Sequence, residues 1–290
     1  MDTLFQVHRR GLSLDQTELG TQPPVDGVVL SVFLAEPGLR PPARDTAVSP
    51  DELSALLTEA HRVQEQLPVP SWLSFEGHLQ HLDLLLAAGV RIFGLVHSWD
   101  NPLAGAATDP RPVTTGLTDA GAAAVRAVYA AGALVDVSHM SDEAFEHTAA
   151  IAEELGRPLI ATHSATRALT PSPRNLTDDQ IRRIARSGGL IGVTLHSPHL
   201  VQPPHRGRAT AADWAAHVEH IVALVGPAHV ALGSDLDAMA RLPEGITTAT
   251  DLSKLEGALA GLDLSDGAIE SILRGNARRV LNALPSKQDP

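Results

Sequence analysis

Residues 134–164, LVDVSHMSDEAFEHTAAIAEELGRPLIATHS, contain the pattern that decides the fold of this chain. Two short apolar runs within it, Leu134–Val137 and Pro158–Thr162, have the composition of buried strands. The segment between them starts with Ser-Asp-Glu and ends at a glycine, which predicts a capped helix. Each run is followed within two residues by a histidine, His139 or His163. The stretch therefore predicts a strand–helix–strand unit with a histidine at the carboxyl end of each strand.

The same alternation extends over the rest of the chain. Capping boxes at Ser49 and Thr177 predict the starts of two further helices. Repeated strand–helix alternation implies parallel strands with right-handed crossovers, either in an open doubly wound sheet or in a closed (β/α)₈ barrel. The glycine-rich phosphate-binding fingerprints of many open sheets are absent from the sequence. The other predicted strands are Val28–Leu34, Trp72–Phe75, Ile92–Val96, Leu190–Leu195 and His229–Gly233.

Polar residues at the strand ends favour the barrel. Glu76, His97, His139, His163 and Asp235 each lie at or just past the end of a different apolar run. In a barrel these ends converge on one face, where active sites are built. The sequence therefore predicts a TIM barrel that forms a single domain over residues 1–290. Seven strands are visible, so we expect the first strand to be truncated.

Composition excludes several classes of function. The chain has 290 residues, 22 Lys and Arg against 34 Asp and Glu, and a formal net charge of −12. An acidic chain without a basic cluster is a poor ligand for nucleic acid. The absence of cysteine excludes disulfides and thiolate chemistry. Neither a spanning apolar run nor a signal-peptide pattern is seen, so we expect a cytoplasmic protein without a membrane partner.

Glutamate and histidine at convergent strand ends predict a metal site. These side chains suit Zn²⁺, with Mn²⁺ and Co²⁺ as alternatives. A carboxylate can also bridge two metal ions and so support a binuclear hydrolase. Glu76 is the natural candidate for such a bridge.

Several motifs occur along the chain in a characteristic order. Among them are SFEG at 74–77, LVHSWDN at 95–101, LVDVSHMS at 134–141, ATHS at 161–164 and GSDLD at 233–237. With these motifs in this order, the chain resembles the membrane (renal) dipeptidase family of zinc dipeptidases, in its soluble bacterial form. The resemblance implies a (β/α)₈ metallohydrolase with two zinc ions that cleaves dipeptides, including those with a C-terminal D-residue, through a metal-bridged hydroxide. It is also compatible with a homodimer.

The resemblance assigns roles to residues that match the family's motifs. It implies that Glu76 bridges the two metals, with His139 and His163 completing the second metal site. The family's first metal is bound by a His-x-Asp motif after the first strand, and here Asp2 is the expected ligand while the histidine is missing. We therefore expect an incomplete first site, with the missing strand and histidine supplied by upstream sequence.

The resemblance also assigns substrate-binding and catalytic roles. His97 is expected to bind the substrate and to stabilise the oxyanion, and Arg174 to pair with the C-terminal carboxylate, for which a guanidinium is well suited. Asp235 is expected to orient the hydroxide and to move its proton to the leaving amine. Asp237 is an alternative, because a continued strand would place both aspartates on the same side.

Two further interpretations stay open at this point. The first alternative to a dipeptidase is another binuclear metal-dependent amide or lactam hydrolase. The second is a homologue that binds a small peptide but is inactive, because its first metal site is incomplete. Other histidines, His196, His199 and His205, follow the run Leu190–Leu195. One interpretation places them in the lining of the substrate pocket, and a solvated loop is the default interpretation.

Overall fold

The computed structural model describes residues 2–7, 26–33, 49–110, 116–202, 209–236 and 241–284. For residues 2–7 and for Phe33, only the backbone is described.

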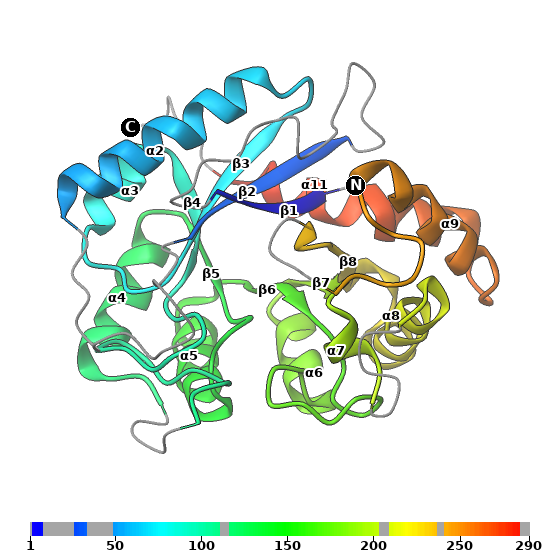
Figure 1. Ribbon diagram of the computed structural model, residues 1–290. Coiled ribbons are helices and arrows are strands. Elements are labelled where there is room, and N and C mark those ends of the chain that lie inside the picture. Colours follow the sequence, from blue (N-terminus) through cyan, green and yellow to red (C-terminus); the bar gives the residue numbers. More distant parts are fainter. Residues whose placement is uncertain are drawn as a thin grey trace.

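Eight parallel strands form one sheet in the order of the sequence, from β1 to β8 (Figure 1). β1 also lies beside β8, so the sheet curls round into a barrel. The predicted (β/α)₈ fold class is confirmed. The strands are β1 (Asp2–Val7), β2 (Gly27–Phe33), β3 (Ser71–Glu76), β4 (Val90–Gly94), β5 (Leu134–Asp136), β6 (Leu159–Ser164), β7 (Leu190–Thr194) and β8 (Val230–Gly233).

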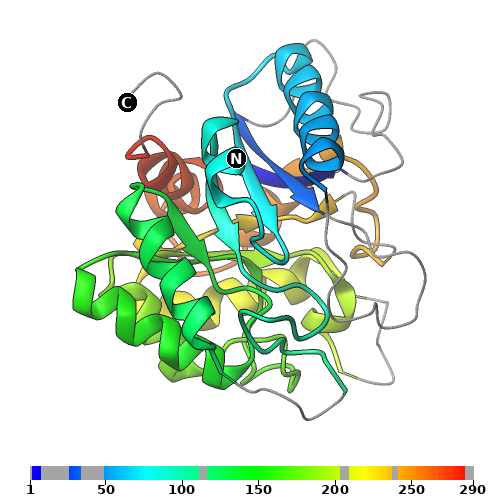
Figure 2. The ribbon, with the colours of Figure 1, turned by 90° about the vertical axis from the view of Figure 1, so that its left-hand side faces the viewer.

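Helices alternate with the strands and lie on the outside of the barrel (Figures 1 and 2). The capping boxes predicted at Ser49 and Thr177 are both present. The helices are α2 (Pro50–Gln66), α3 (Leu82–Ala87), α4 (Asp119–Ala130), α5 (Asp142–Leu155), α6 (Asp178–Arg186), α7 (Ser197–Leu200), α8 (Ala211–Val225), α9 (Ser253–Ala260), α10 (Asp266–Glu270) and α11 (Asn276–Leu281), with short turns η1 (Pro227–His229), η3 (Ala249–Leu252) and η4 (Ser271–Gly275).

The first strand differs from the sequence-based expectation. Residues Asp2–Val7 form β1, which pairs with β2 from Asp2 opposite Gly27 to Val7 opposite Val32. The segment DTLFQV has a polar residue near each end and lacks the β-branched run that marked the other strands, so its pattern did not reveal it. Its pairing with β2 supplies the strand that was expected to be missing.

The amino end of the barrel is filled by hydrocarbon. Val29, Ile92, Leu134, Ile160 and Leu190 contribute one buried layer from five strands. Helix α11 packs against this layer and covers that end of the barrel, through the apolar side chains of Ala277, Val280 and Leu281.

Two glycines allow the last strands to approach closely. A Cβ atom added at Gly192 of β7 or at Gly233 of β8 would lie 2.1 or 2.0 Å from the carbonyl oxygen of Thr162 in β6. No side chain fits at such distances, so both positions require glycine. The approach brings β7 and β8 against β6 one residue before His163.

Candidate metal centre

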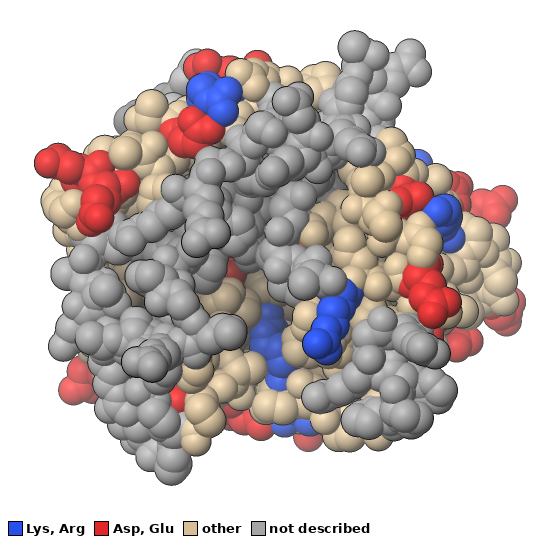
Figure 3. Space-filling model, viewed as in Figure 1, with Lys and Arg blue, Asp and Glu red and all other residues tan. Residues whose placement is uncertain are grey.

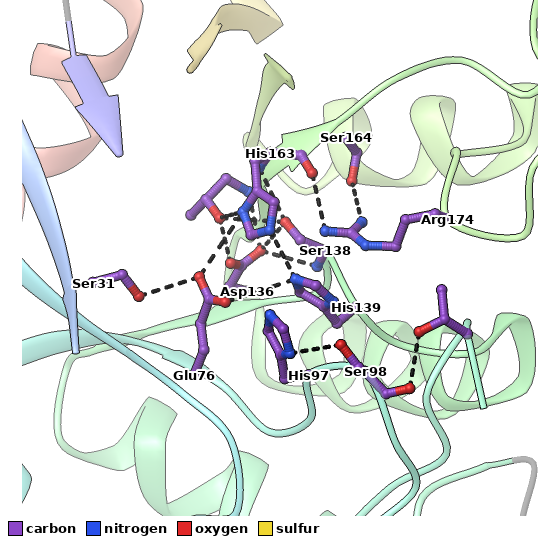
Figure 4. Close-up of polar contacts among 12 residues, drawn as sticks. Ser31, Glu76, His97, Ser98, Asp136, Ser138, His139, His163, Ser164 and Arg174 are labelled. Carbon is purple, nitrogen blue, oxygen red and sulfur yellow. Dashed lines mark hydrogen bonds and ion pairs between the residues drawn. The ribbon is translucent and has the colours of Figure 1, made fainter. Parts of the chain in front are cut away.

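The carboxyl ends of the strands bring together four side chains predicted from the sequence, those of Glu76, His97, His139 and His163 (Figure 4). Glu76 is the last residue of β3, and His163 lies within β6. His139 follows β5, and His97 follows β4 by three residues. Gly94 lies opposite Glu76 in the β3–β4 pair, where an added Cβ would come into contact with Glu76 Cγ at 3.4 Å.

Glu76, His139 and His163 form a cluster that could hold a metal ion, with one ligand atom of each within 4.8 Å of the others. The Nε2 atoms of the two histidines are 2.8 Å apart, and His139 Nε2 is 3.7 Å from Glu76 Oε2. Ser31 donates a hydrogen bond of 3.2 Å to Glu76 Oε1. Glu76 Oε2 is buried and has no hydrogen-bond partner among the residues that the structure describes.

The electrostatics of this cluster favour a bound cation. Burial raises the pKa of Glu76 well above its ordinary value, and the nearby Asp136 and Asp235 raise it further. Burial also lowers the pKa of His139 and of His163 well below the ordinary value, with Arg174 adding to the effect. Neutral imidazoles present lone pairs, and a divalent cation would favour the ionised carboxylate. The donor set and the unsatisfied Glu76 Oε2 therefore fit a metal ion.

A hydrogen-bond chain fixes the orientation of His163. Thr162 Oγ1 donates to Asp136 Oδ2 and also lies 2.8 Å from His163 Nδ1. The hydroxyl has a single hydrogen, and a carboxylate oxygen accepts, so Nδ1–H of His163 must be the donor to Thr162. The Nε2 atom of His163, which faces His139, then carries the lone pair. Partners of this kind orient metal-binding histidines.

Asp136 is a residue of the candidate site that the sequence reasoning missed. It is buried, and its Oδ1 accepts hydrogen bonds from the backbone N–H of Ser138 and of Thr162, both at 3.0 Å, and from Ser138 Oγ at 2.6 Å. The residue lies inside the apolar run LVDV, where a carboxylate without a partner would be costly. The cost of burying a carboxylate in such a run could have identified Asp136 from the sequence.

Arg174 is buried beside the cluster. Its guanidinium donates to the backbone oxygen of His163 at 3.2 Å and to Ser164 Oγ at 3.3 Å. Burial lowers the pKa of Arg174 to about 10, while Asp136 and Glu76 oppose this shift. The side chain therefore remains cationic at neutral pH.

Asp235 follows β8 in a strained turn. Its φ of 53° is the only positive value at a non-glycine residue in the described part of the chain, and the residue is 2% exposed. Such a conformation is uncommon for a residue with a side chain and often occurs at functional sites. Asp237, the alternative considered from the sequence, lies outside the described residues.

His97 lies next to the cluster. Its ring is 4.2 Å from that of His139, measured between centroids, and its Nδ1 atom is 2.8 Å from Ser98 Oγ. The contact with Ser98 holds the ring in place beside the proposed ligands.

A cavity of about 370 Å³ contains this site. His196 and His199 belong to its wall, which agrees with the pocket-lining interpretation and not with the default of a solvated loop; His205 lies outside the described residues. His196 follows β7 by two residues, so the strand-end rule that selected the other histidines applies to it as well. The cavity is lined by His97, Ser98, Trp99, Thr108, His139, His163, Arg174, Thr194, His196, His199 and Asp235.

The backbone position of Asp2 does not match the role expected for it. Asp2 is the first residue of β1 and pairs with Gly27 at the amino end of the barrel, whereas Glu76 pairs with Phe33 at the carboxyl end. The resemblance had placed Asp2 just beyond a strand, but this residue begins one. Its side chain and the residue that follows β1, His8, lie outside the described residues.

A parallel barrel with a Glu–His–His cluster at the carboxyl ends of its strands is typical of metal-dependent hydrolases. Comparison with known sequences agrees with this class. The sequence profile of the membrane dipeptidase family (peptidase family M19) matches residues 43–289. An uncharacterized protein encoded in the pqqA 5′ region of Klebsiella pneumoniae is 34% identical over 212 residues, which cover 71% of this chain and 77% of that protein.

Proteins named as dipeptidases, and solved structures of metallopeptidases, are also similar to this chain. Dipeptidase aclJ of Aspergillus oryzae is 29% identical over 220 residues, which cover 76% of this chain and 51% of that protein, so the chain spans about half the length of this relative. A metallopeptidase from Rhodobacter sphaeroides, solved with a phosphinate mimic of the dipeptide L-Ala-D-Ala, superimposes with a TM-score of 0.77 at 22% identity and covers 95% of this chain and 90% of its own.

The chain belongs to the membrane dipeptidase family. The predicted family, and with it the class of metallodipeptidases, is confirmed. Within the described residues, no helix is long and apolar enough to cross a membrane. The cytoplasmic location and the homodimer stay predictions.

Proposed function

We propose that this chain is a zinc-dependent dipeptidase that accepts dipeptides with a C-terminal D-residue. One observation carries the proposal: two members of the Glu76–His139–His163 cluster, His139 and His163, line the same cavity as the buried cation of Arg174. The volume of about 370 Å³ is within the roughly 300–1,000 Å³ typical of small-molecule sites. The dipeptidase relatives, and the L-Ala-D-Ala mimic bound to the Rhodobacter sphaeroides enzyme, support this substrate class.

Glu76, His139 and His163 would hold the zinc ion, because their donor atoms suit zinc and the buried Glu76 Oε2 needs a partner. Bound zinc supplies Lewis-acid activation of a peptide carbonyl and of water. The described donors account for one ion. The chain Asp136–Thr162–His163 keeps the lone pair of His163 Nε2 directed into the cluster.

Three further side chains act on the substrate in this proposal. Arg174 pairs with the C-terminal carboxylate and so favours cleavage of a peptide bond close to the C-terminus. Asp235 accepts a proton from the attacking water and passes it to the leaving amine. His97 stabilises the negative charge that develops on the carbonyl oxygen.

The test is hydrolysis of L-Ala-D-Ala and L-Ala-L-Ala by the purified chain, after zinc loading and after chelation. We expect turnover of both that depends on zinc. L-Ala-D-Ala amide, which lacks the terminal carboxylate, should be a poor substrate because Arg174 then has no partner. An absence of turnover by the zinc-loaded chain would contradict the proposal and favour the peptide-binding homologue.

A further inference from the structure

Two histidines in the cavity wall have no role in the proposed chemistry. His196 immediately precedes α7 and His199 lies within it, and both line the cavity that contains the candidate metal centre. Their ring centroids are 4.6 Å apart with the planes at 63°, an edge-on arrangement. The two imidazoles therefore form one continuous patch, which we call the α7 histidine pair.

The cavity is rich in hydrogen-bond donors and poor in acidic groups. Among its described lining residues, Asp235 is the single carboxylate, whereas Arg174 is a cation and five residues are histidines. An imidazole offers an N–H donor in both its neutral and its charged form. The chain as a whole has a net charge of −12, so this donor-rich lining departs from its average composition. On the face shown in Figure 3, basic side chains lie at the central hollow, while acidic ones lie mostly towards the periphery.

The α7 histidine pair is held on a rigid support. The backbone oxygen of Leu200 accepts hydrogen bonds from Thr170 Oγ1 and from His217 Nε2, both at 2.9 Å. The backbone N–H of Ser197 donates to the backbone oxygen of Arg241 at 2.9 Å. A wall fixed in this way loses little entropy when it binds a ligand.

This support is joined directly to the residue next to Arg174. The side-chain amide of Asn175 is buried and donates to the backbone oxygen of His199 at 2.9 Å and to that of Thr170 at 2.8 Å. The position of α7 is therefore tied to that of Arg174. Because Arg174, His196 and His199 line one cavity, we place the side chain of the C-terminal residue, whose carboxylate Arg174 would bind, beside α7.

We propose that the α7 histidine pair binds an acidic side chain on the C-terminal residue, so that the preferred substrates are dipeptides ending in aspartate or glutamate. This inference rests on the proposed dipeptidase function. Arg174 and the histidine pair would then hold the two carboxylates of one residue. A neutral amide side chain of the same shape would make weaker contacts, because hydrogen bonds to a charged acceptor are roughly twice as strong as neutral ones.

The kinetic test compares isosteric substrates on the zinc-loaded chain. We expect kcat/KM for Ala-Asp to exceed that for Ala-Asn by about tenfold or more, with the same direction for Ala-Glu against Ala-Gln. In the variants His196→Gln and His199→Gln this ratio should fall towards one. His220→Gln is the matched control, because His220 pairs with Asp178 outside the cavity, and it should retain the ratio.

A binding measurement separates failure of this inference from failure of the proposed function. Calorimetry on the same zinc-loaded protein would compare free aspartate with free asparagine in both D and L forms, which requires no turnover. Tighter binding of aspartate, lost in the two histidine variants, supports the inference even if no dipeptide is cleaved. Equal binding and equal kcat/KM for acid and amide, or a preference that both variants retain, would overturn it. Thermal melting of each variant shows that it is folded.

Discussion

At the carboxyl end of the barrel the strands bury polar and charged groups, whereas at the amino end they bury hydrocarbon. The change takes place within two residues of a single strand. Leu134 of β5 belongs to the apolar layer against α11, and Asp136 accepts the hydrogen bonds that orient the candidate metal centre. In β6 the corresponding pair is Ile160 and Thr162. Residues two apart point to the same face and are roughly 6.6 Å apart along the strand.

This comparison shows how one strand can serve stability and chemistry together. The apolar layer contributes hydrophobic burial. The polar layer contains a carboxylate, Glu76, that burial disfavours in its charged form. Changes at the amino end should therefore affect mainly stability, and changes at the carboxyl end mainly metal binding and activity.

The largest effect is expected for Glu76→Gln. Loss of the carboxylate should lower kcat/KM by at least about 10³-fold, because metal activation contributes several kcal/mol to the transition state. The metal-free variant should melt at the same temperature as the metal-free parent or higher, since the amide removes a carboxyl whose ionisation is disfavoured. Dipeptide kinetics and calorimetric melting measure the two effects. If the metal-free Glu76→Gln variant were much less stable than the metal-free parent, the carboxyl end of the barrel would also contribute to stability, against this prediction.

Ile160→Ala should lower stability and leave metal binding unchanged, the reverse of the result expected for Glu76→Gln. Removing most of this buried side chain from the layer under α11 should cost about 2–5 kcal/mol in the free energy of unfolding. Zinc stoichiometry should stay the same, because the candidate ligands lie at the other end of the barrel. Urea denaturation and metal analysis test this expectation, and loss of zinc from the folded variant would contradict it.

Asp136→Asn and Thr162→Val should weaken zinc binding while leaving all three candidate ligands in place. Each change breaks the chain that orients His163, and loss of such partners typically costs about 10–100-fold in metal affinity. Competition with a chromogenic chelator measures the affinity without any assay of activity. Thr162→Ser is the matched control, because it keeps the hydroxyl and should bind zinc as the parent does.

The smallest effect concerns pH and His217, which supports α7. Its Nδ1 accepts from the backbone N–H of Thr166 at 3.1 Å and its Nε2 faces Leu200 O, so the folded protein needs the neutral ring. Burial lowers the pKa of His217 below 6.5. As pH falls below 6.5, the unfolded chain binds a proton that the folded chain does not. His217 should therefore remove up to about 1.4 kcal/mol of stability per pH unit below that value.

The measurement is the free energy of unfolding of the parent and of His217→Gln between pH 7.5 and 5.5. The variant should be less stable at pH 7.5, and the difference between the two proteins should shrink as pH falls. A difference that stays constant with pH would show that His217 binds its proton equally well in both states.

The sequence was sufficient where a local pattern specifies the outcome. Capping boxes at Ser49 and Thr177 start helices, because the side chains that satisfy the first backbone N–H groups lie within three residues. The strand-end positions of Glu76, His139 and His163 followed from the apolar runs and from the rule that parallel strands end on one face.

Three features could not be obtained from the sequence. Strand β1 has no strong pattern of its own and is defined by its pairing with β2, so Asp2 was placed at the wrong end of a strand. Asp136 looked like part of an apolar run, because its partner Thr162 is 26 residues away in the chain. The place of His196 and His199 in the cavity wall was not decided by the sequence, since the backbone of α7 is held by hydrogen bonds from the distant residues Asn175, Thr170 and His217.

The sequence by itself therefore determined the alternation of strands and helices, the family, and the candidate ligands Glu76, His139 and His163, because each helix start, strand end and family motif is a local pattern. The tertiary structure decided which of these side chains meet, how His163 is oriented, and which other groups line the cavity. Those properties depend on contacts between distant segments, which form only when the barrel brings the strands side by side.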